Sequence, residues 1–119
     1  MKSKEEIKEI IDKYMNDSYI GYGVKDLAYM IDGALDGGLD NSDIILYKYN
    51  EKSKKHYVGI STNFGYIVLT IEWVVSWITN DTTLQITNGK AFYTQEKLYE
   101  KGFDDIETIL YDKEEEEEE

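Results

Sequence analysis

Residues 44–71, IILYKYNEKSKKHYVGISTNFGYIVLTI, decide the fold class of this chain. Tyr, Ile and Val dominate three runs within this stretch, which cover 44–49, 56–61 and 66–71. Residues 50–55 between the first two runs are polar, and the segment TNFG at 62–65 separates the second run from the third. Runs of this composition, bounded by turn residues, are typical of β-strands joined by tight turns. We therefore expect the middle of the chain to form an antiparallel sheet.

The sheet is expected to continue downstream through a further hairpin. Residues 83–87 and 90–93 are rich in strand formers and flank Asn88-Gly89. Asn-Gly is the dipeptide that most strongly favours a two-residue hairpin turn, because both of its residues tolerate positive φ. The sequence therefore predicts that these two runs pair with each other.

The segment between these hairpins, residues 73–78, has no single interpretation. It fits either a continuation of the third strand or a short helix, since periodicity does not separate the two. Trp73 and Trp77 are four positions apart and share one face in both cases. We expect the two tryptophans to pack together in the core.

Two helices are expected before the sheet and one after it. In the first, over 4–15, Ser3 is followed three positions later by Glu6, the arrangement of a capping box. Apolar residues then recur at helical spacing, and they do so again over 24–35. A short helix is expected over 95–101, ended by a glycine.

This order of elements predicts an α+β fold, with N-terminal helices packed on an antiparallel sheet of four to five strands and a short C-terminal helix. Residues 1–111 form a single globular domain in this interpretation. Residues 104–111 have an ambiguous pattern that fits a helix in part. Residues 112–119 form an acidic tail of low complexity, which we expect to be disordered.

The charge of the chain favours basic partners. The formal net charge of the 119 residues is −12, and the tail holds seven acids and one lysine. Cysteine is absent, which excludes disulfides and thiolate metal sites, and all 13 basic residues are lysines. Arginine is the preferred reader of phosphates and base edges, so its absence argues against direct binding of nucleic acid. No secretory signal or membrane span is recognisable, and we expect a cytoplasmic protein without a membrane partner.

Catalytic, cofactor-binding and metal-binding residues are not expected. His56 is the single histidine and lies beside two lysines at the start of a predicted strand. No P-loop, dinucleotide-binding glycine motif or nucleophile elbow is present. The acids over 32–43 do not have the alternating spacing of an EF-hand loop. The sequence therefore predicts a protein that binds rather than catalyses, with no cofactor.

A row of aspartates is the candidate binding surface. Carboxylates four positions apart on a helix stand about 5–6 Å from each other, an interval similar to that between phosphates along a nucleic-acid strand. Such a row presents a phosphate-like ridge to a basic protein, and a solvated helix face explains the same pattern. Tyrosines near the row add rigid contact area. The expected partner-binding residues are Asp26, Asp32, Asp36, Asp40, Asp43, Tyr22 and Tyr29.

A small, acidic, cysteine-free domain with an acidic tail resembles, as a class, the anti-CRISPR and antirestriction proteins of phages and mobile elements. The resemblance implies an inhibitor that binds a nuclease or another nucleic-acid-binding enzyme and blocks its nucleic-acid-binding surface, in some cases as a DNA mimic. An immunity protein or antitoxin that neutralises a basic toxin is the alternative. A scaffold without effect on any nuclease is a third interpretation.

Overall fold

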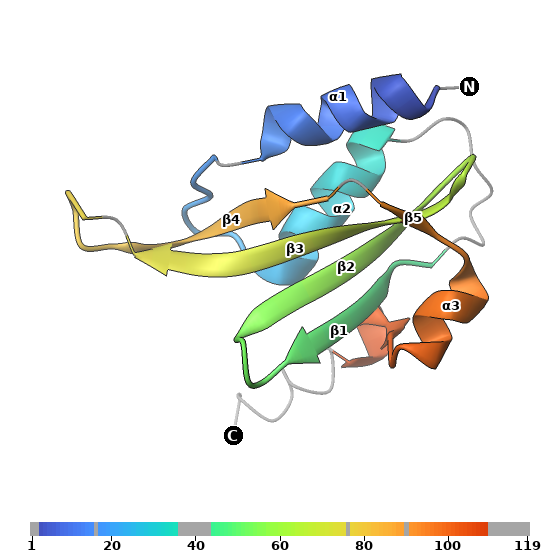
Figure 1. Cartoon of the computed structure of the whole chain (residues 1–119). Coiled ribbons are helices and arrows are strands. Elements are labelled where there is room, and N and C mark those ends of the chain that lie inside the picture. The colour runs from blue at the N-terminus through green and yellow to red at the C-terminus, as the bar shows by residue number, and fades with distance from the viewer. Residues whose placement is uncertain (1–2, 16, 36–43, 76, 90, 110–119) are drawn as a thin grey trace.

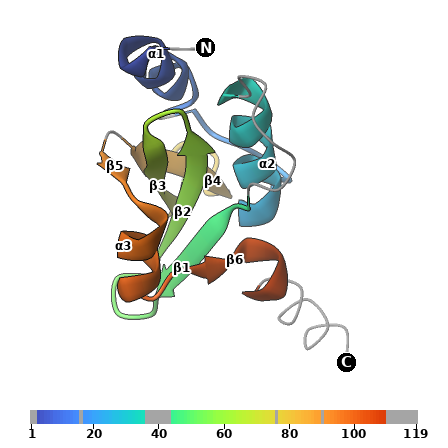
Figure 2. The same ribbon diagram turned by 90° about the vertical axis from the view of Figure 1, so that its right-hand side faces the viewer.

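The structure, a computed structural model, describes residues 3–15, 17–35, 44–75, 77–89 and 91–109. In chain order the helices and strands are α1 (Lys4–Tyr14), α2 (Val24–Leu35), β1 (Leu46–Asn50), β2 (Lys55–Thr62), β3 (Gly65–Val75), β4 (Thr82–Asn88), β5 (Phe92–Tyr93), α3 (Gln95–Glu100) and β6 (Asp104–Asp105). The strands form one six-stranded sheet, with α2 and α3 on opposite sides of it (Figures 1 and 2). The expected α+β class is confirmed.

The sheet is antiparallel, with the strand order β4-β3-β2-β1-β6. It has six strands rather than four to five because Asp104–Asp105 pairs with β1 before a helical turn at 106–109. The three central runs of the sequence form β1, β2 and β3, as expected. The tail, 112–119, lies outside the described residues.

The predicted hairpin at Asn88-Gly89 is wrong. β4 and β5 do not pair with each other. Both pair with β3, so β5 continues along the same edge of β3 after a short interruption of the strand. The Asn88 side chain bonds locally, since its Oδ1 accepts from the Gly89 N–H at 2.8 Å. A Cβ on Gly89 would lie 2.4 Å from Leu69 Cδ2, so the glycine permits a close crossing over β3 instead of a turn.

The two N-terminal helices cover one face of the sheet and form the main core with it. The capping box of α1 is present, with Ser3 Oγ accepting from the Glu6 N–H and Glu6 accepting from the Ser3 N–H. Both helices lie where the sequence predicts them. The core side chains include Ile7, Ile11, Leu27, Ile31, Val58, Ile60, Ile67, Leu69, Ile71, Leu84 and Ile86.

The opposite face of the sheet is covered only in part. Its second, smaller core joins Leu98 of α3 and Phe103 to Leu46 and Tyr66 of the sheet. α3 has six residues, about 9 Å of helix, which is shorter than the sheet that it packs against. Much of this face therefore remains without a helix over it.

Within the described ranges, no helix combines the length and the apolar character needed to cross a lipid bilayer.

Candidate partner-binding surface

The outer end of the β3–β4 hairpin exposes apolar side chains, among them the two tryptophans expected in the core. Residues 67, 69 and 71 of β3 point toward the helices and are buried, and Trp73 and Val75 continue the same alternation. Yet Trp73 is 51% exposed and Val75 is 52% exposed. The expected core packing of the tryptophans is wrong because the hairpin projects beyond the helices that cover the rest of this face (Figure 1).

The turn of the hairpin adds two further apolar side chains. Trp77 is 100% exposed and Ile78 is 95% exposed. Asn80 follows with a φ of 61°, a left-handed conformation that asparagine tolerates better than most residues. We refer to Trp73, Val75, Trp77 and Ile78 as the hairpin end. Exposed apolar groups gathered in this way are typical of interaction sites rather than of ordinary surface.

The loop between α1 and α2 lies beside the hairpin. Tyr19 exchanges backbone hydrogen bonds with Leu84 of β4, at 3.0 and 3.4 Å, and Leu84 in turn pairs with Trp73. Ile20 next to Tyr19 is largely exposed. Tyr22, a predicted partner-binding residue, meets Tyr19 edge to face with 5.6 Å between the ring centroids. The loop therefore extends the exposed apolar surface across the β4 edge.

Two of the predicted aspartates and one predicted tyrosine lie on α2. Asp26 is exposed, and its Oδ2 accepts from the Gly23 N–H at 2.9 Å, which closes the first turn of the helix. Tyr29 is partly exposed, and Asp32 is half-buried one turn further on. Asp36, Asp40 and Asp43 lie outside the described residues. The structure thus describes only the first part of the proposed row.

Acids from the C-terminal part of the chain join the row near Tyr29. The Tyr29 hydroxyl donates to the Glu107 carboxylate. Burial, followed by this hydrogen bond, raises the pKa of Tyr29 to about 12, and Asp105 and Asp32 act in the same direction. Sequence reasoning missed Glu107 and Asp105, because only the pairing of β6 with β1 brings them to α2.

His56 belongs to the packing of the first hairpin. Its Nδ1 lies 2.6 Å from the Tyr47 hydroxyl, and its ring lies 4.6 Å from the ring of Tyr49. Burial raises the pKa of Tyr47 to about 12, with a smaller contribution from Tyr49. Across the described part of the chain, no group of three His, Cys, Asp or Glu side chains is arranged to hold a metal ion.

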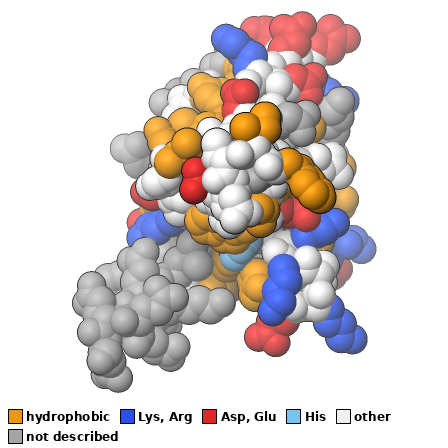
Figure 3. Space-filling model, turned by 90° about the vertical axis from the view of Figure 1, so that its left-hand side faces the viewer, with side chains coloured by type: hydrophobic (Ala, Val, Ile, Leu, Met, Phe, Trp, Pro, Cys, Tyr) orange, Lys and Arg blue, Asp and Glu red, His pale blue; other side chains and the backbone are white. Residues whose placement is uncertain are grey.

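The two ends of the face seen in Figure 3 differ in their balance of charge. Acidic side chains outnumber lysines at the end where α1 lies, and lysines outnumber acids near the β1–β2 turn, with hydrophobic side chains between the two ends. Lys52 and Lys54 of that turn are exposed. An apolar region between an acidic and a basic end has the composition of a protein-binding surface.

No protein-family model, no curated protein and no solved structure matches this chain. The candidate surface is therefore defined by its own geometry: the hairpin end, the neighbouring loop, and the acidic outer side of α2.

Proposed function

We propose that this protein is a non-catalytic inhibitor, which binds a nucleic-acid-processing enzyme in the cytoplasm and blocks the surface that holds nucleic acid. The partner in this proposal is a basic protein such as a nuclease, and the inhibitor contacts neither nucleic acid nor membrane. Its acidic side chains occupy sites that otherwise hold phosphates, as in a DNA mimic.

The observation that carries the proposal is the exposure of the hairpin end. Tryptophan is among the residues most enriched in binding hot spots, and its energy is gained when it fills a desolvated pocket on the partner. Trp77 is fully exposed here and has Ile78 beside it. Burial of a side chain such as isoleucine contributes about 1.5–3 kcal/mol. Such a pair supplies the apolar anchor of a protein interface.

The choice of a basic partner rests on charge. A net charge of −12 repels nucleic acid and draws the protein toward cationic surfaces. A channel that binds phosphates is a ready-made cationic surface, and complementary charge accelerates encounter with it. Glu107 and Asp105 near Tyr29 add negative charge beside the carboxylates of α2, which also favours a basic partner.

The experiment is a pull-down with the tagged full chain from cells that contain a candidate nuclease, washed at low and at high salt. We expect a nucleic-acid-processing enzyme to be retained at low salt and released by its own nucleic-acid substrate, because both ligands compete for one surface. The triple variant Asp32→Asn, Asp36→Asn, Asp40→Asn should retain roughly tenfold less enzyme if each charge contributes about 0.5 kcal/mol.

Two results would contradict this function. Retention of the enzyme together with its nucleic acid would show that the binding surface is not blocked. Capture of a small basic toxin through the high-salt wash, in place of an enzyme, would assign the protein to immunity instead.

A further inference from the structure

The part of the sheet that α3 leaves uncovered forms a second surface, on the face opposite to that of the hairpin end. Lys48, Tyr57, Thr70 and Asn88 are successive cross-strand partners on β1, β2, β3 and β4, and all four line one concavity. Its volume is about 620 Å³. Small-molecule sites in proteins have volumes of about 300–1,000 Å³.

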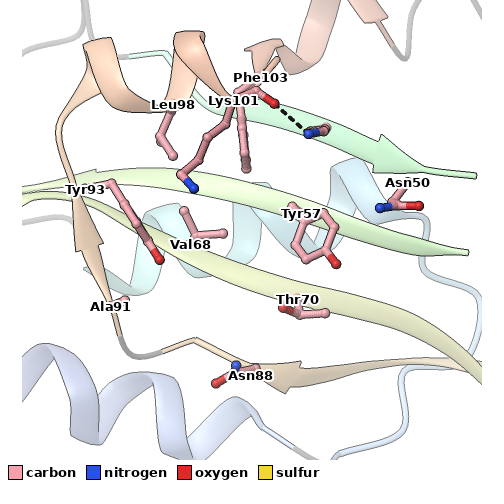
Figure 4. A pocket seen from close by; sticks show the side chains of 11 residues that line it. Asn50, Tyr57, Val68, Thr70, Asn88, Ala91, Tyr93, Leu98, Lys101 and Phe103 are labelled. Carbon is pink, nitrogen blue, oxygen red and sulfur yellow. Dashed lines mark hydrogen bonds between the residues drawn. The ribbon is translucent and has the colours of Figure 1, made fainter. Parts of the chain in front are cut away.

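Two tyrosines give the concavity flat walls. Val68 lies between Tyr57 and Tyr93, and both rings border the space above it (Figure 4). All three side chains are partly buried and pack against the smaller core, so their positions are fixed by the fold. Aromatic side chains in such an arrangement bind planar groups by stacking and edge contacts.

The cations of the concavity come from Lys101 and Lys48. Lys101 reaches toward Val68 between the tyrosines, with its Nζ 5.7 Å from the centroid of the Tyr93 ring (Figure 4). Lys48 Nζ donates to the Lys101 carbonyl oxygen at 2.6 Å. An ammonium group has three N–H donors, so this bond leaves Lys48 with further donors for a ligand.

The lining of the concavity contains these two lysines and no acid. Among the residues that the structure describes, neither lysine has a carboxylate within salt-bridge distance, and the ion pair found on α3 joins Lys97 to Glu100 instead. The chain as a whole has 25 acids and 13 basic residues. A cationic concavity on a strongly acidic protein selects for a ligand that brings its own negative charge.

We propose that this concavity binds a small planar anion: a flat aromatic or heteroaromatic body that carries a sulfonate, carboxylate or phosphate. The flat body lies beside the Lys101 side chain, against the ring of Tyr57, and the anionic group meets the ammonium groups of Lys101 and Lys48. The Thr70 hydroxyl and the Asn88 amide border the same space and contact polar edges of the body. This site is separate from the hairpin end, and it does not depend on the function proposed above.

The test is a fluorescence titration of the full chain with anilinonaphthalene sulfonate, an aromatic anion with a flat naphthalene body. The matched probe is N-phenylnaphthylamine, which has the same rings without the charge. We expect saturable binding of the anion and much weaker binding of the neutral probe. Lys101→Gln and Lys48→Gln should each weaken anion binding by about tenfold, the usual effect of losing a charged hydrogen bond.

Two control variants make the result specific. Lys97→Gln removes a lysine of α3 that does not line the concavity, and it should leave the affinity unchanged. Trp77→Ser removes the largest exposed apolar side chain of the hairpin end, and it should also leave the affinity unchanged. Near-UV circular dichroism of each variant verifies that its side chains stay packed, since loosened proteins also bind this probe and keep their far-UV signal. Equal affinity for the two probes, or anion binding that survives both lysine substitutions, would overturn the proposal.

Discussion

A substitution at Gly89 tests the path of the chain between β4 and β5, because the sequence predicted a hairpin turn at this position. A Cβ at this position would lie 2.4 Å from Leu69 Cδ2 and 3.3 Å from Ile11 Cγ2, inside the main core. Both of those side chains are buried, so an added methyl group must displace a packed neighbour. Overpacking of this kind costs about 1–3 kcal/mol. Replacement of glycine also reduces the entropy of the unfolded chain, which returns about 0.4–1 kcal/mol.

We therefore expect Gly89→Ala to lower the free energy of unfolding by up to about 2.6 kcal/mol, the difference between these two effects. Gly33→Ala is the matched control. Gly33 lies within α2, is exposed, and has no atom within 4 Å of an added Cβ. The same substitution there should raise the free energy of unfolding by up to about 1 kcal/mol, because alanine is the better helix former.

The assay is urea unfolding of wild type, Gly89→Ala and Gly33→Ala, followed by far-UV circular dichroism. An unchanged m-value shows that a shift of the midpoint reports a change in stability. The two variants should move the midpoint in opposite directions. A stabilised Gly89→Ala variant would refute the close crossing over Leu69.

Three further predictions concern other parts of the fold. The pKa of Tyr47 is raised from 10.0 to about 12, so the folded state holds the phenol proton more tightly than the unfolded state. The resulting contribution to stability is complete below pH 10, and about 3 kcal/mol is lost as the pH rises through 12. Urea unfolding should therefore show a shallower alkaline decline of stability for Tyr47→Phe than for wild type. Ser3→Ala removes the side-chain half of the capping box of α1 and should cost about 1 kcal/mol in thermal unfolding, whereas an unchanged melting temperature would argue against that cap. Trp77→Ser should change the free energy of unfolding by less than about 0.5 kcal/mol, because the side chain is fully exposed; a large loss would place it in the core after all.

Local signals in the sequence predicted most of the helices and strands. The capping box and the apolar periodicity placed α1 and α2, because both features act within a few residues of each other along the chain. The central strands followed from composition and turn residues for the same reason. The Asn-Gly signal failed because the contact of Gly89 with Leu69 joins residues 20 positions apart, outside the reach of a dipeptide pattern.

Burial and the candidate sites depend on longer-range geometry. Period-two alternation placed Trp73 on the apolar face of β3, but it does not give the length of the helical layer that covers that face. Tyr29 and Glu107 are 78 positions apart, and no pattern in the sequence joins them. The concavity on the other face is lined by residues from five strands, so it exists only once the register of the sheet is known.

The central claim, that the hairpin end anchors a basic nucleic-acid-processing enzyme, is tested most directly by comparing three tagged proteins in parallel pull-downs. Wild type is compared with Trp77→Ser/Ile78→Ser and with Phe64→Ser, which removes an exposed aromatic side chain at the opposite end of β3. The account predicts that wild type and Phe64→Ser retain the same enzyme and that the double variant, although folded, loses most of it. Equal retention by all three proteins would contradict the claim.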